Sequence, residues 1–162
     1  MEIRPIRKSE LIQLLGLYRH LHETDDPLPA SDVLERTWQK IQGDPNHKCF
    51  GVFQDGVIVS SCILCIIPNL TRGCRPYGII ENVVTHSAFR RRGFGRKVLQ
   101  HALDHAWRQG CYKVMLLTGR KNEATYRFYE SAGFDRNTKQ AFIAKPKTAE
   151  PDAPVDESRP HS

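Results

Sequence analysis

The stretch ENVVTHSAFRRRGFGR, residues 81–96, indicates both the local fold and the kind of ligand that this chain binds. A predicted strand, Tyr77–Thr85, ends within it, and Gly93 and Gly95 then lead directly into a predicted helix. Glycine lets the backbone bend and a ligand approach, while the first free N–H groups of a helix donate to anions. The neighbouring arginines add charge-assisted contacts to phosphate. The stretch therefore predicts a phosphate or pyrophosphate site, and the alternative is a basic strand-to-helix turn without a ligand.

The composition is that of one globular domain. The chain has 162 residues, of which 40% are hydrophobic and 26% are charged, and this length allows a sizeable core. No apolar run approaches the roughly 20 residues that a membrane span needs, so no membrane association is expected. Residues 1–10 lack the apolar region of a secretory signal. We therefore expect the five cysteines to be reduced thiols in the cytoplasm.

The net charge of +6 is unevenly distributed, because residues 146–162 carry Lys147 and Arg159 against four acidic side chains. A positive body attracts polyanions, which here means either nucleic acid or a small phosphorylated cofactor. The densest basic cluster, residues 90–97, is short and is interrupted by two glycines. Nucleic-acid surfaces usually spread their basic residues more widely and add stacking aromatics. The charge pattern therefore favours a small cofactor, and no nucleic-acid partner is expected.

Hydrophobic periodicity predicts an α/β domain at residues 1–145 and a tail after it. Strands are predicted at residues 2–6, 48–54, 57–67, 77–85, 112–117 and 141–145, and helices at 11–21, 32–42, 95–109 and 122–132. Asp55 and Gly56 join two of these strands as a hairpin turn, since both tolerate φ > 0. The strand at 112–117 is nearly all apolar, as expected for a strand buried on both faces. From Pro146 onward, abundant Pro, Asp, Glu and Ser predict a disordered acidic tail.

Two motifs, in the right order, resemble those of the GNAT superfamily of N-acetyltransferases. Arg90-x-x-Gly93-x-Gly95 looks like the Q/R-x-x-G-x-G/A loop of that family. Asn122, followed by YESAGF at residues 129–134, resembles its N-x6-Y-E-x-x-G-F ending. The resemblance covers residues 2–145 and implies a mixed, mostly antiparallel central sheet flanked by helices. It also implies acetyl transfer from acetyl-CoA to the primary amine of a small acceptor, by direct attack and without a metal.

The resemblance implies roles for individual residues as well. Strand residues 83–85 would meet the acetyl group and the pantetheine arm, residues 91–96 would wrap the pyrophosphate, and Asn122 would bind the pantetheine arm. The cofactor-binding residues implied in this way are Val83, Val84, Thr85, Arg91, Arg92, Gly93, Phe94, Gly95, Arg96 and Asn122. Tyr129 would protonate the departing CoA thiolate as a general acid, and its alternative is core packing. Glu81 is the candidate general base, through water, and its alternative is a solvated carboxylate or a salt bridge.

The acceptor is less well defined by the sequence. Carboxylates at residues 23–26 suit a cationic amine, and Arg72 and Arg75 suit an anionic group, which together suggest a small zwitterionic acceptor. Residues 110–113 and 128–130 are similar to glucosamine-6-phosphate N-acetyltransferases, which usually carry an acidic pair where this chain has Glu81 and Asn82. That departure counts against a sugar phosphate. The alternatives are acetylation of a protein N-terminus or lysine, a non-catalytic CoA-binding module and a basic nucleic-acid-binding module.

A cysteine pair, a histidine pair and an apolar strand could also indicate function or assembly. Cys62 and Cys65 lie on an apolar strand without a second cysteine pair, and His101 and His105 have no third ligand in the sequence, so no metal site is predicted. The apolar content of Val57–Ile67 exceeds what one face of a sheet needs, and we therefore expect a homodimer.

Overall fold

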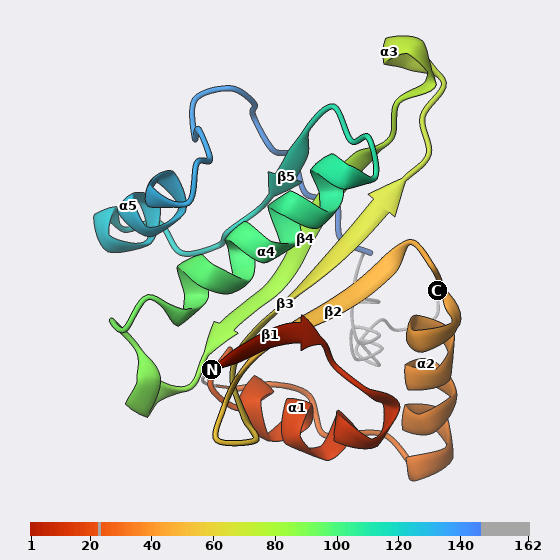
Figure 1. Cartoon of the computed structure of the whole chain (residues 1–162), viewed down its shortest axis with the longest axis vertical. Coiled ribbons are helices and arrows are strands. Elements are labelled where there is room, and N and C mark those ends of the chain that lie inside the picture. Colours follow the sequence, from red (N-terminus) through yellow and green to blue (C-terminus); the bar gives the residue numbers. More distant parts are fainter. Residues whose placement is uncertain (23, 147–162) are drawn as a thin grey trace, which may run out of the picture.

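The structure is a computed structural model that describes residues 1–22 and 24–146. Its strands are β1 (Glu2–Pro5), β2 (His47–Gln54), β3 (Val57–Ile67), β4 (Tyr77–Thr85) and β5 (Val114–Leu116). Its α-helices are α1 (Leu11–Tyr18), α2 (Ser31–Gly43), α3 (Thr71–Cys74), α4 (Phe94–Arg108) and α5 (Glu123–Ser131), and two short 3₁₀ helices are η1 (Lys8–Glu10) and η2 (Ser87–Phe89). Figure 1 shows α4 running across the sheet, α5 beside α4, and α3 projecting beyond one end of the sheet.

The five strands form one mixed sheet in sequence order. Strands β1 to β4 pair antiparallel with their neighbours, whereas β5 pairs parallel with β4. The turn between β2 and β3 is made by Asp55 and Gly56 with φ of 50° and 80°, as the predicted hairpin requires. The predicted α/β fold with a mixed, mostly antiparallel sheet is therefore confirmed.

Helices cover both faces of this sheet and create two apolar cores. The first core joins the apolar stripe of α4 to side chains of β2, β3 and β4, among them Val98, Leu99, Ala102, Phe50, Leu64 and Ile80. The second joins α1 and α2 to the opposite face, among them Leu14, Leu17, Trp38, Phe53 and Ile63. The strand β3 lies in the middle and is buried for most of its length. Its apolar content is thus explained within one chain, which removes the reason from which the homodimer was predicted.

Several predicted boundaries were wrong, and each error has a structural cause. Residues 141–145 form no strand and do not add to the open outer edge of β5, so Phe142 and Ile143 are 90% and 72% exposed. The strand β5 spans only Val114–Leu116 and is half-buried, since it is an edge strand rather than an internal one. Helix α1 ends at Tyr18, three residues before the predicted end. A turn with i→i−3 hydrogen bonds then follows to residue 21. The predicted tail lies outside the described residues, apart from Pro146.

Candidate active site

A cavity of about 870 Å³ opens where β4 and β5 separate. The two strands pair only from Gly78 to Ile80 on β4, opposite Val114–Leu116. Beyond Ile80, β4 continues to pair with β3, while its residues 81–85 line the cavity. Backbone groups along an edge without a strand partner are available to the polar groups of a ligand. The fork between β4 and β5 is therefore a place where an extended amide-bearing ligand can add to the sheet.

A β-bulge shapes the β4 wall of this fork. The pairing of β3 with β4 shifts between Ser61 and Ile63, and the facing residue Asn82 has a left-handed φ of 50°. Asparagine adopts this conformation more readily than most residues. A bulge bends its strand and re-aims the neighbouring side chains. Here the bend lies beside Glu81, at the point where β4 leaves β5.

The phosphate loop predicted at residues 91–96 lies in the same cavity. Gly93 is the N-cap of α4 with φ of 80°, and Arg91 has φ of 60°. The amide of Lys97 donates to the Gly93 carbonyl at 3.0 Å and so begins the hydrogen bonding of α4. The backbone amides of residues 91–96 donate no hydrogen bond within the described chain. A run of free amides at a helix N-terminus fits a pyrophosphate group.

The two glycines of this loop serve different purposes. An added Cβ at Gly93 would meet nothing within 4 Å, so this glycine is needed for its φ of 80° and keeps the ligand side open. An added Cβ at Gly95 would lie 3.0 Å from Cζ of Phe128 and 3.1 Å from Oγ1 of Thr85. Gly95 therefore lets the first turn of α4 approach both α5 and the end of β4.

Three of the arginines around the loop, Arg90, Arg91 and Arg96, line the cavity. Arg92 does not, and its guanidinium lies 5.4 Å from the centre of the Phe89 ring. Arg90 donates from Nε to the carbonyl of Thr85 at 3.2 Å and from Nη2 to the carbonyl of His20 at 3.0 Å. Arg90 therefore fixes the loop to the end of β4 and to the segment after α1.

Both predicted catalytic side chains line the cavity, Glu81 from β4 and Tyr129 from α5. The Tyr129 ring is half-buried, with the rings of Phe128 and Phe134 at 4.9 Å and 6.3 Å between centroids. Burial raises the pKa of the Tyr129 phenol, the positive charge of Arg120 lowers it and Glu81 raises it further. The phenol thus stays protonated at neutral pH and can donate a proton, while the exposed Glu81 carboxylate can accept one.

Asn122 has a structural task that the motif alone did not reveal. It is the N-cap of α5, where its Oδ1 accepts from the amide of Thr125 at 2.9 Å. Asn122 does not line the cavity, whereas Val83, Val84 and Thr85 do. The contact of Asn122 with the pantetheine arm stays a prediction.

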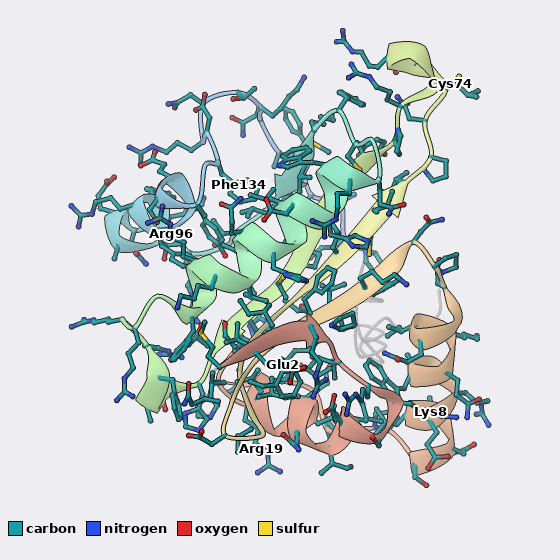
Figure 2. The ribbon with its side chains drawn as sticks, in the orientation of Figure 1. Glu2, Lys8, Arg19, Cys74, Arg96 and Phe134 are labelled. Atoms are coloured by element: carbon teal, nitrogen blue, oxygen red, sulfur yellow. The ribbon has the colours of Figure 1, made fainter. Side chains whose placement is uncertain are left out.

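Other residues proposed for the acceptor lie elsewhere. Arg72 and Arg75 lie 6.0 Å and 5.9 Å from the centre of the Tyr112 ring and are not part of the cavity lining. They belong to the projecting region around α3, where Figure 2 shows Cys74 far from Arg96. Of the predicted acidic loop, Glu23 lies outside the described residues, and Asp25 and Asp26 are exposed away from the lining.

The patterns that were not assigned to function are accounted for by packing. Cys62 is buried in the first core, and burial raises the pKa of its thiol, which disfavours the reactive thiolate. His101 and His105 pack edge-on against Phe50, with centroid distances of 4.8 Å and 5.3 Å. Across the ranges that the structure describes, no three His, Cys, Asp or Glu side chains gather as a metal site would require.

Among the lining residues that sequence reasoning missed are three with basic or titratable side chains, His20, His22 and Arg120. The first two follow α1, and the third precedes α5. They belong to neither motif, and their position in the cavity depends on contacts between segments about 100 residues apart. For Arg120, the sequence offered one signal of a role in the cavity: a basic side chain in the loop between β5 and α5.

The sequence profile of the acetyltransferase (GNAT) family matches residues 14–134. The chain belongs to this family. A glucosamine 6-phosphate N-acetyltransferase from Trypanosoma brucei brucei is 32% identical over 140 residues, covering 86% of this chain and 92% of that protein. A solved structure of a proposed acetyltransferase from Agrobacterium tumefaciens str. C58 is 40% identical, with a TM-score of 0.83, covering 90% of this chain and 100% of that one. The crystal structure of glucosamine-6-phosphate N-acetyltransferase from Arabidopsis thaliana is 26% identical, with a TM-score of 0.75. The match covers 91% of this chain and 98% of that one.

This GNAT protein is an N-acetyltransferase that acts on an amine, and acetyl-CoA is the acetyl donor that the fold family uses. The predicted family and enzyme class are therefore confirmed. Among the described helices, none combines the length and the apolar character that crossing a membrane requires.

Proposed function

We propose that this GNAT enzyme acetylates the primary amine of a small acceptor that also carries an anionic group, with an amino sugar phosphate as the first candidate. The observation that carries the proposal is the charge of the cavity. Glu81 is the one acidic residue in its lining within the described chain, whereas Arg90, Arg91, Arg96 and Arg120 are basic. Such a lining favours an anionic donor and an anionic acceptor, while the single carboxylate suits the amine. The extensive similarity to glucosamine 6-phosphate N-acetyltransferases supports the sugar phosphate.

The proposed binding of acetyl-CoA follows the shape of the cavity. The pyrophosphate lies on the free amides of residues 91–96, with Arg91 and Arg96 beside it. The pantetheine arm runs along the open edge of β4 at residues 83–85. A β-strand edge and an amide-bearing arm complement one another's hydrogen bonding, so this arrangement directs the thioester toward Glu81 and Tyr129.

The chemical step needs a neutral amine, an oriented thioester carbonyl and a destination for two protons. The Glu81 carboxylate, acting through a bound water, takes one proton from the ammonium, and the neutral nitrogen attacks the acetyl carbon. The attacking nitrogen then loses its second proton to solvent, and as the carbon–sulfur bond breaks the Tyr129 hydroxyl gives its proton to the departing thiolate. The thioester is activated already, and therefore no acyl-enzyme is required.

An acceptor panel tests this proposal, with release of the CoA thiol as the readout. The panel compares glucosamine 6-phosphate, glucosamine, zwitterionic amino acids and a peptide with a free N-terminus. We expect the highest kcat/KM for glucosamine 6-phosphate, at least about tenfold above glucosamine, because a phosphate that is paired with arginine contributes about 1.5–3 kcal/mol. Preference for the peptide would instead support a protein acetyltransferase. Retention of CoA without turnover of any amine would support a binding module.

We also propose that the enzyme is a homodimer in the cytoplasm, without a nucleic-acid partner. Two features support self-association: the outer edge of β5 pairs with no strand of the described chain, and Phe142 and Ile143 are highly exposed. Light scattering should give twice the chain mass for the wild type and a lower mass for Phe142→Ser. A wild-type mass of one chain would contradict the proposed dimer. The five free cysteines support a reducing compartment.

A further inference from the structure

The segment that follows α1 is held in the cavity by two arginines. Residues 20–22, here named the bridge segment, line the cavity. Arg90 donates from Nη2 to the His20 carbonyl at 3.0 Å, and Arg120 donates from Nη2 to the Leu21 carbonyl at 3.1 Å. Arg90 belongs to the loop before α4 and Arg120 to the loop between β5 and α5. The bridge segment is therefore tied to two separate walls of the cavity.

Arg120 also acts on the proposed general acid. Arg120 and Tyr129 line the same cavity, and the positive charge of Arg120 opposes the increase in the Tyr129 pKa that burial and Glu81 cause. A solvent-exposed arginine side chain has many rotamers, so its charge alone would seldom be fixed. The hydrogen bond to Leu21 restricts the Arg120 guanidinium to the cavity. One contact therefore both anchors the bridge segment and holds a cation in the cavity that Tyr129 lines.

We propose that Arg120 is a positioning residue for acetyl transfer: its guanidinium, anchored on the Leu21 carbonyl, holds the bridge segment at the cavity and keeps a positive charge beside the Tyr129 phenol. This inference rests on the proposed role of Tyr129. When the Tyr129 proton passes to the CoA sulfur as the carbon–sulfur bond breaks, a phenolate remains. The Arg120 charge stabilises that phenolate, which later regains a proton from water.

Three variants separate charge, anchoring and general surface effects. Arg120→Gln removes the charge, Arg120→Lys keeps it, and Lys121→Gln removes a neighbouring exposed cation that is not part of the cavity lining. The first readout is tyrosinate absorbance after a rapid alkaline pH jump, with Tyr129→Phe subtracted to isolate Tyr129. We expect Tyr129 to ionise at a higher pH in Arg120→Gln. In Arg120→Lys and Lys121→Gln, the pH at which Tyr129 ionises should stay close to that of the wild type.

The second readout is the rate of acetyl transfer under conditions where chemistry limits turnover. We expect kcat to fall about tenfold in Arg120→Gln with the KM for acetyl-CoA unchanged, because a weaker acid transfers its proton more slowly. Arg120→Lys should recover most of that loss, and Lys121→Gln should lose none. The third readout is amide hydrogen exchange in residues 20–22, which should become about tenfold faster in Arg120→Gln as the anchor is lost.

The proposal is overturned if the ionisation of Tyr129 does not move in Arg120→Gln. It is also overturned if Lys121→Gln lowers kcat as much as Arg120→Gln, or if exchange in the bridge segment stays at the wild-type rate. Failure of the wild type to acetylate any amine would refute the proposed function instead. The titration and exchange experiments would still test Arg120, because neither of them needs turnover.

Discussion

The ring of Phe128 lies directly against Gly95, so that a Cβ at residue 95 would be 3.0 Å from the Cζ atom of the ring. This contact joins the first turn of α4, which carries the phosphate loop, to the helix that carries Tyr129. The absence of a side chain at Gly95 therefore lets the proposed donor site and the proposed acid lie on closely packed elements.

Gly95→Ala tests this close packing. The new methyl group would press on Phe128 and on Oγ1 of Thr85, and we expect the free energy of unfolding to fall by about 1–2 kcal/mol. Urea denaturation measures the change. Gly16→Ala is the matched control, since nothing lies within 4 Å of that position on α1; it should raise the free energy of unfolding by about 0.5–1 kcal/mol. Equal effects of the two variants would contradict the packing role of Gly95.

Gly93→Glu tests the phosphate loop. Acetyl-CoA should raise the melting temperature of the wild type, because a ligand that binds only the folded state stabilises it. A carboxylate at residue 93 repels the pyrophosphate and strains a backbone with φ of 80°, so the increase should disappear. Gly16→Glu adds the same charge on the exposed side of α1 and should keep the full increase. A normal increase in Gly93→Glu would refute the assignment of this loop to the cofactor.

Glu10 should make stability depend on pH in the acidic range. Its carboxylate accepts from both Nη atoms of Arg4 at 2.9 Å and 2.8 Å and from the amide of Arg7 at 2.7 Å. The hydrogen bonds from Arg4 are the main cause that lowers the Glu10 pKa from 4.5 to about 2.

Because the pKa is lower in the folded state, the stabilisation is complete above pH 4.5 and is lost as the pH falls toward 2. We expect the free energy of unfolding of the wild type to fall by about 1–3 kcal/mol through this pH range. Glu10→Gln should be less stable than the wild type at pH 7, and the difference should shrink toward pH 2. Urea denaturation across that range measures it, and a pH-independent difference would contradict the prediction.

The sequence predicted those features that local patterns determine. Strands β3 and β4 have the predicted bounds, since β3 is a long, largely apolar run between Gly56 and Pro68 and β4 is a β-branched-rich segment that begins after Pro76. The stretch at residues 81–96 and the second motif also named residues that share one cavity, among them Glu81, Gly93 and Tyr129; their roles in binding and catalysis stay predictions.

Features that depend on distant partners could not be predicted. The run at 141–145 has the composition of a strand, but pairing requires a neighbour that composition does not reveal. The anchoring of Leu21 by Arg120 uses a backbone carbonyl 99 residues away in the sequence. No side-chain pattern around Leu21 records such a contact, since every residue has a carbonyl group.

Glu81→Gln tests the proposed general base. The amide keeps the shape of the side chain but accepts a proton poorly, so attack then depends on amine that is already neutral in solution. We expect a lower rate at neutral pH and a rate profile displaced toward higher pH, where the acceptor loses its proton unaided. The rate difference from the wild type should therefore narrow as pH rises. A uniform loss at every pH would assign Glu81 to acceptor binding rather than to proton removal.

Tyr129→Phe tests the proposed general acid. The substitution keeps the ring and its packing against Phe128 and Phe134 but removes the proton donor. Removal of a general acid typically lowers the rate about 10²–10⁴-fold, and we expect the low end because a thiolate is a tolerable leaving group. Acetyl-CoA affinity should change little. Tyr126→Phe, whose ring lies 4.8 Å below the Arg136 guanidinium and outside the cavity lining, is the matched control. Wild-type turnover by Tyr129→Phe, where chemistry limits the rate, would make Tyr129 a packing residue and leave water or the ammonium proton as the acid.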